Sequence, residues 1–232
     1  MTTQDTINIR NSSISYLALR RCLGVLGLLL PLLILVFNGF EFKSSISHFY
    51  YSSSSVFFTG FMFAFGIFLI FYPGRIDESD KISDGWVTTI GGIGAILTAL
   101  IPTAYCSLSE LPILITDELS YFCDGAGLTT QYIHNNSTLS FIHLSCAAIF
   151  LGLMGYMSFS RFTKGRTTAK MRVFYKFCAI MVWLPLVILG IKFIFNLEWT
   201  PYDVFILECV SLVFFGTAWL VKGKMFERYG FH

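Results

Sequence analysis

The sequence predicts an all-α, polytopic membrane bundle of six transmembrane helices with both termini in the cytoplasm. Three observations predict this fold class. The 232 residues are 55% hydrophobic and only 13% charged, which is about half the charged share of an ordinary soluble domain. Six apolar runs are each long enough to cross a bilayer. Nearly all Lys and Arg residues lie on one side of the crossings that these runs define.

The expected spans follow from the lengths of the uncharged runs. Because a bilayer core holds no water, a crossing segment must satisfy its own backbone, which favours helices of about 20 apolar residues. The spans are 22–40, 52–73, 86–106, 138–160, 177–197 and 202–221. They make a transmembrane domain at 22–221, with cytoplasmic segments expected at 1–21 and 222–232. The third span carries Gly91, Gly92, Gly94 and Ala95, small residues that predict close helix packing.

Orientation follows from the distribution of cationic residues. If the N-terminus is cytoplasmic, only Lys43 and Lys192 of the 16 Lys and Arg residues fall on the outer side. The others lie in the four inner segments: Arg10, Arg20, Arg21, Arg75, Lys81, Arg161, Lys164, Arg166, Lys170, Arg172, Lys176, Lys222, Lys224 and Arg228. The positive-inside rule therefore places both termini in the cytoplasm.

The longest connection, 107–137, is expected outside and contains acidic residues but no Lys or Arg. Cys106 and Cys123 lie at its start and within it, in a compartment where disulfides persist. A disulfide between them would close a loop of about 18 residues and stabilise the fold by roughly 3 kcal/mol. The alternative is a pair of free thiols.

Ionisable groups inside spans are costly and are the first places to look for function. His143 and Glu208 each lie a little more than one turn into a span from the outer side, about 7 to 8 Å deep at a rise of about 1.5 Å per residue. This equal depth predicts a direct contact between the two side chains. Asp203 follows Thr200-Pro201 at the start of the last span, a capping arrangement that favours a structural role.

Three interpretations of the outer polar residues stay open. The first is a structural hydrogen bond between His143 and Glu208. The second is a ligand pocket formed by His143, Glu208, His48, Ser47 and Tyr51. The third is a metal centre, with zinc as the candidate metal and His48, His134, His143 and Glu208 as its candidate ligands.

Several stretches resemble a group of bacterial six-helix integral membrane proteins and, more distantly, the DRAM-type membrane proteins. They are 45–51 (Ser-Ile-Ser-His-Phe-Tyr-Tyr), 99–103 (Ala-Leu-Ile-Pro-Thr), 143–147 (His-Leu-Ser-Cys-Ala), and Glu208 with 219–223 (Trp-Leu-Val-Lys-Gly). The resemblance implies the six-helix fold and the cell inner membrane, but no reaction. In that group an acidic residue often precedes a Val-Phe-Val-Gly stretch, where this sequence has Ser55.

A second resemblance is to the CREST superfamily of metal-dependent membrane hydrolases. Ser44 and His48 match its Ser-x-x-x-His element. The His-x-x-x-His pair of that superfamily's final helix has no counterpart, since the last span here offers Asp203 and Glu208. A seventh helix is also missing.

Three functions are consistent with these features. The leading interpretation is a non-enzymatic bundle whose outer pocket binds membrane lipids or another small amphipathic ligand. The alternative is a metal-dependent membrane hydrolase of lipid amides or esters, and the third option is a proton-coupled transporter. A net charge of +2, scattered along the chain, argues against nucleic-acid binding.

Overall fold

The computed structural model describes residues 3–72, 74, 83–104, 121–123, 127–129, 137–165, 167–195, 197 and 199–225. They form six α-helices: α1 (Thr3–Phe37), α2 (Ser55–Ile70), α3 (Asp84–Leu100), α4 (Ser137–Tyr156), α5 (Ala169–Phe195) and α6 (Asp203–Lys222). A 3₁₀ helix spans Ser47–Tyr51, and α4 continues as a π-helical turn at Met157–Arg161. Strands β1 (Tyr121–Cys123) and β2 (Gly127–Thr129) form one short antiparallel hairpin.

The predicted helical fold is confirmed in the described part of the chain. Four of the helices, α1, α4, α5 and α6, are long and apolar enough to cross a membrane. The other two, α2 and α3, are apolar but only 16 and 17 residues long, which is about 24 to 26 Å of helix. The largest difference from the expected bounds is in α1, which starts at Thr3 within the segment expected to precede the first span.

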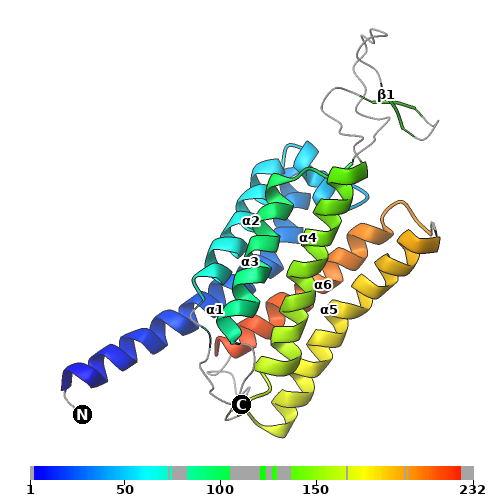
Figure 1. Cartoon of the computed structure of the whole chain (residues 1–232). Helices are drawn as coiled ribbons and strands as arrows, with labels where there is room; N and C mark the ends of the chain where they lie inside the picture. The colour runs from blue at the N-terminus through cyan, green and yellow to red at the C-terminus, as the bar shows by residue number, and fades with distance from the viewer. Residues whose placement is uncertain are drawn as a thin grey trace.

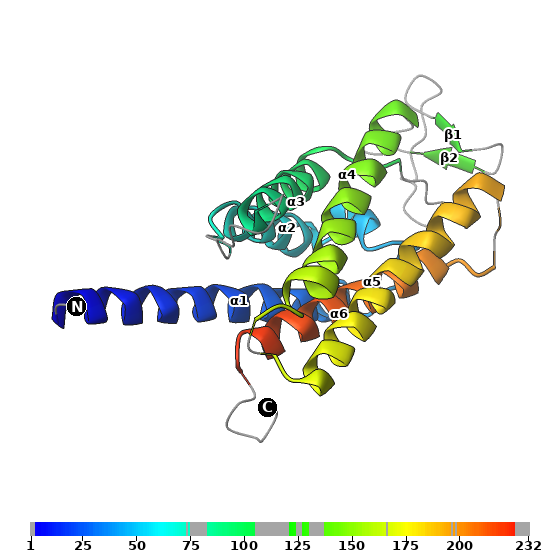
Figure 2. The same ribbon diagram turned by 60° about the horizontal axis from the view of Figure 1, so that its bottom comes forward.

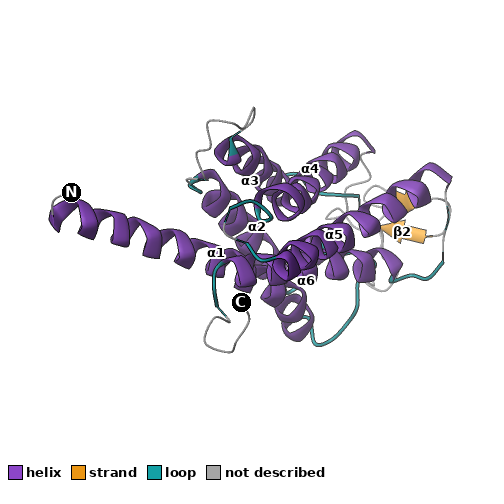
Figure 3. Cartoon of the chain, turned by 90° about the horizontal axis from the view of Figure 1, so that it is seen from below, coloured by secondary structure: helices purple, strands orange, loops and turns teal. Residues whose placement is uncertain are grey.

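Each helix packs against its neighbours in the sequence, and α1 also packs against α6, so the six helices form a closed ring. Figures 1 and 2 show this arrangement, and the view from below in Figure 3 shows the helices in cross-section. The first turns of α1 project away from the other helices in all three views.

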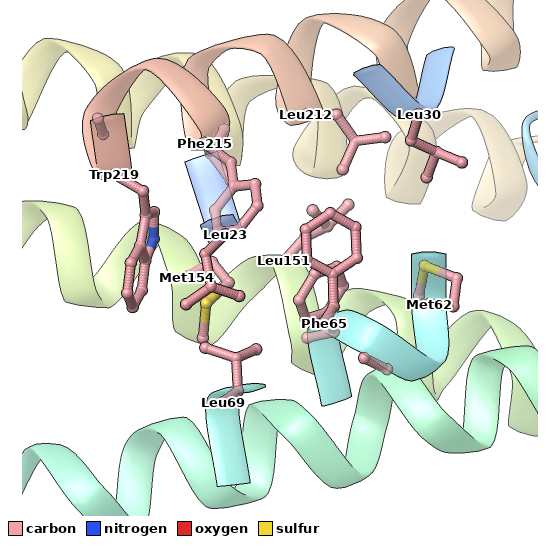
Figure 4. Packing of buried hydrophobic residues seen from close by; sticks show 14 of the residues in the cluster. Leu23, Leu30, Met62, Phe65, Leu69, Leu151, Met154, Leu212, Phe215 and Trp219 are labelled. Atoms are coloured by element: carbon pink, nitrogen blue, oxygen red, sulfur yellow. The ribbon is translucent and has the colours of Figure 1, made fainter. Parts of the chain in front are cut away.

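The interior of the ring is filled by large apolar side chains from several helices. In Figure 4, Leu23 of α1, Phe65 of α2, Met154 of α4 and Phe215 of α6 converge from different sides, and none of the four has measurable exposed surface. The ring of Phe65 lies edge-on to that of Phe215, with 5.5 Å between their centroids. Rings at this separation add to the stability that burial alone supplies.

Small residues allow α3 to approach both of its neighbours closely. A Cβ atom placed on Gly92 would lie 2.7 Å from the carbonyl oxygen of Gly66 in α2, and one on Gly94 would lie 2.9 Å from that of Cys146 in α4. Both distances are shorter than a side chain allows. The small-residue run of the third predicted span therefore serves helix packing, as expected.

Buried ion pairs lie at opposite ends of the bundle. Arg161 Nε lies 3.2 Å from Asp84 Oδ1 and joins the π-helical turn to the start of α3. At the other end, Lys192 near the end of α5 pairs with Asp203 at the start of α6. In both pairs the side chains are at most 12% exposed, so each charge depends on its partner for compensation.

Candidate functional site

The candidate site is built around the segment between α1 and α2, residues 38–54, which we call the connector. Helix ends leave backbone N–H and C=O groups without partners in their own helix. The connector supplies hydrogen-bond partners for such groups at the ends of two helices. Ser54 Oγ donates to the carbonyl oxygen of Ile34 in α1 at 2.7 Å. The N–H of Phe205 in the first turn of α6 donates to the carbonyl oxygen of Ser44 at 2.9 Å.

His143 of α4 ties this connector to the end of α3. The side chain is buried, with the residue 1% exposed. Its Nδ1 lies 2.6 Å from the carbonyl oxygen of Ile101, and its Nε2 lies 2.8 Å from Ser47 Oγ. Because a carbonyl oxygen can only accept, Nδ1 carries the hydrogen that it donates to Ile101. In the neutral ring, Nε2 then accepts from the Ser47 hydroxyl.

Glu208 of α6 binds the same short stretch of the connector. Its Oε2 accepts a hydrogen bond from the backbone N–H of Ile46 at 2.6 Å. His143 and Glu208 are thus linked through two consecutive residues, Ile46 and Ser47. The direct hydrogen bond expected between the two side chains is replaced by these two bonds to the backbone and hydroxyl of the connector.

His48 and Tyr51 also bond the connector to the residues that follow α3. His48 lies 2.7 Å from Ser44 Oγ through Nδ1 and 3.1 Å from the carbonyl oxygen of Ala104 through Nε2. The hydroxyl of Tyr51 donates to the carbonyl oxygen of Thr103 at 2.7 Å. The matched Ser-x-x-x-His element therefore forms a local hydrogen bond across one turn.

The electrostatic state of His48 follows from its surroundings. Burial lowers its pKa from the ordinary value of 6.5 to about 4, and the electrostatic interactions with His143 and Lys43 act in the same direction. The hydrogen bond to Ala104 opposes them. With this pKa His48 is neutral at physiological pH, and because Nε2 donates to the carbonyl oxygen of Ala104, Nδ1 of the neutral ring accepts from the Ser44 hydroxyl.

The proposed metal ligands do not come together in the described part of the chain. No group of three or more His, Cys, Asp or Glu side chains is close enough to hold a metal ion among the described residues. Both ring nitrogens of His48 and of His143 already have protein partners. His134 lies outside the described residues, as do Cys106 and the side chain of Cys123, so the disulfide between them stays a prediction.

A cavity of about 490 Å³ lies between α4, α5 and α6. Most of its wall is apolar, and its polar contributors include Glu208, Lys192 and Ser145. Of the five predicted pocket residues, only Glu208 lines this cavity; His143, His48, Ser47 and Tyr51 hold the connector instead. The sequence pattern did not reveal the cavity, because a gap between helices leaves no mark on hydropathy.

Lys192, which lines the cavity, is held by an ion pair with Asp203. The carboxylate of Asp203 pairs with Lys192 and also accepts from the backbone N–H groups of Trp199 and Thr200, each at 3.4 Å. The ammonium group of Lys192 lies 5.0 Å from the centre of the Trp199 ring. These contacts fix the turn between α5 and α6, which agrees with the structural role expected for Asp203.

A scan of protein-family models and searches of curated proteins and of solved structures find no match to this chain.

Proposed function

We propose that this protein is a six-span, non-enzymatic membrane protein of the cell inner membrane that binds an amphipathic ligand, such as a membrane lipid, in the cavity between α4, α5 and α6. The cavity is the observation that carries the proposal. Its volume of about 490 Å³ lies in the range of about 300 to 1,000 Å³ that is usual for small-molecule sites. Membership of the six-helix bacterial group is part of the same proposal and rests on the sequence stretches quoted above.

The proposed topology places both termini in the cytoplasm and the connector outside. The cationic residues support this orientation through the positive-inside rule. The two short helices, α2 and α3, need the residues that flank them or a local thinning of the bilayer to complete a crossing. Reporters fused after residues 80, 130, 165 and 232 test the topology, since only the reporter at 130 is expected to be extracytoplasmic.

The composition of the cavity wall favours an amphiphile over a water-soluble ligand. The lining includes Phe141 and Leu144 of α4 and Leu186 and Leu189 of α5, a wall suited to a hydrocarbon chain. Charged groups, Glu208 and Lys192, are also part of the lining. Such a wall fits a ligand with an apolar chain and a polar head.

We prefer ligand binding to metal-dependent catalysis because the two histidine side chains are already hydrogen-bonded within the protein. Both nitrogens of His143 and of His48 hold protein partners, so metal coordination by either ring would first break one of these bonds. Glu208, in contrast, lies on the wall of a cavity. It is available to a ligand without such a cost.

Filling the cavity tests the proposal. We expect Leu189→Trp to reduce the lipid that copurifies with the protein, measured by mass spectrometry against a fixed amount of protein. The matched control is Leu184→Trp, one of the exposed residues on the same helix, at 48% exposure, and outside the cavity lining. Equal lipid retention by the two variants would contradict the proposal.

A further inference from the structure

Glu208 has only part of its hydrogen-bonding capacity satisfied by the chain. Oε2 accepts from the Ile46 N–H at 2.6 Å, and no hydrogen bond reaches Oε1 from within the described part of the chain. Oε1 is not among the fully buried polar atoms of the described residues that lack a hydrogen-bond partner, so it keeps accessible surface, and the residue lines the cavity.

The charges around the cavity are unevenly compensated. Lys192 is the other ionisable residue of the lining, and it is paired with Asp203. Glu208 takes part in neither of the ion pairs Lys192–Asp203 and Arg161–Asp84. A carboxylate in an apolar wall is costly unless a positive group or further donors compensate it.

A ligand can supply Glu208 with the positive charge and the hydrogen-bond donor that it does not receive from the described part of the chain. An ammonium group offers both a positive charge and N–H donors, and a hydrogen bond between ionised partners is about twice as strong as a neutral one. An anionic headgroup would be repelled by Glu208, whereas a neutral hydroxyl would supply a donor but no charge. The uncompensated carboxylate therefore selects among amphiphiles by the chemistry of their polar heads.

We propose that the ligand of this cavity carries a primary amine, which binds Oε1 of Glu208 while the hydrocarbon chain lies against Leu186 and Leu189. This inference rests on the proposed function, because it names the class of amphiphile that the same cavity takes. Glu208 is then the residue that determines specificity. The connector orients it through the bond from Ile46.

The test uses three probes with the same chain: dodecylamine, dodecanol and dodecanoate. The purified full-length protein is titrated with each probe in a non-ionic detergent, and the shift in Tm is fitted to give an apparent Kd. We expect dodecylamine to bind about tenfold more tightly than dodecanol, and dodecanoate to bind most weakly. Glu208→Gln should remove the preference for the amine, while it keeps an oxygen that can accept from Ile46.

A matched variant controls for attraction to the protein surface. Glu41→Gln removes an exposed carboxylate of the connector outside the cavity lining and should keep the tenfold preference. Each Tm shift is measured relative to the same variant without probe. A change in the stability of the unliganded variant is therefore not counted as binding. The comparison of probes on the unmodified chain needs no variant.

The outcomes separate this inference from the proposed function. Equal affinities for dodecylamine and dodecanol in the unmodified chain, or a preference retained in Glu208→Gln, would overturn the amine assignment. Loss of binding of all probes in Leu189→Trp would still support the cavity. If Leu189→Trp changes the binding of no probe, the proposed function fails, and the amine assignment fails with it.

Discussion

Gly24 of α1 and Gly216 of α6 meet backbone to backbone where the first and last helices close the ring. A Cβ atom on Gly216 would lie 2.7 Å from the carbonyl oxygen of Gly24, and one on Gly24 would lie 2.8 Å from that of Gly216. In lipid no hydrophobic force drives helices together, so such close approach is a main source of association. The fit between these two helices therefore depends on both glycines.

Gly216→Ala is expected to destabilise the protein by about 1 to 3 kcal/mol, because the added methyl group meets backbone that has no room to move. The free energy of unfolding, measured by titration from mild detergent into SDS, checks this. Gly60→Ala in α2 is the matched control, since nothing lies within 4 Å of a Cβ placed there. Equal stability of the two variants would show that α1 and α6 pack less closely than described.

His143→Ala is expected to destabilise the protein by about 2 to 4 kcal/mol. The change leaves a cavity and removes the donor to Ile101 and the acceptor for Ser47. A double-mutant cycle with Ser47→Ala should give a coupling of about 1 kcal/mol from the free energies of unfolding. Additive effects would contradict the described contact.

A hydroxyl without a tertiary partner gives the control for this cycle. The hydroxyl of Thr217 donates to the carbonyl oxygen of Val213 in its own helix and is exposed. Thr217→Val should therefore be additive with His143→Ala. Coupling there would indicate a global rearrangement.

Hydropathy and charge are sufficient to predict where the apolar helices lie in the sequence. They also predict which helix ends lie at the same end of the bundle. His143 and Glu208 were expected at one end of the bundle, and both bind Ile46–Ser47 at that end. The start of α1 could not be predicted in this way, because a helix that continues beyond an apolar run has polar residues like those of a loop. Thr3–Phe37 forms one helix despite that change in composition.

The exact partners in the site could not be predicted because the connector has no periodic pattern. Equal depth of His143 and Glu208 is necessary for a direct contact but does not fix the distance between α4 and α6. Two consecutive residues of the connector, Ser47 and Ile46, provide the partners instead, at 2.8 and 2.6 Å. A hydroxyl and a backbone amide are common in any loop, so nothing in the sequence distinguished these two.

Arg161→Met is expected to destabilise the protein by about 3 kcal/mol or more, because it removes the guanidinium group whose positive charge compensates the buried carboxylate of Asp84. The double variant Arg161→Met, Asp84→Asn should recover part of that loss, since the remaining charge is removed as well. Thermal unfolding in detergent measures both. A double variant less stable than the sum of the single changes would contradict compensation between these two side chains.

The stability of the protein should depend on pH through His48. Its pKa is about 4 in the folded protein, because of burial, against an ordinary value of 6.5. Between these values the unfolded chain binds more protons, so the free energy of unfolding rises with pH. The contribution is complete above about pH 6.5, falls as the pH is lowered towards 4, and amounts to a few kcal/mol, on the order of 3. Unfolding of the unmodified chain and of His48→Gln from pH 4 to 8 tests this: the variant should have the flatter profile, and parallel profiles would contradict the assignment.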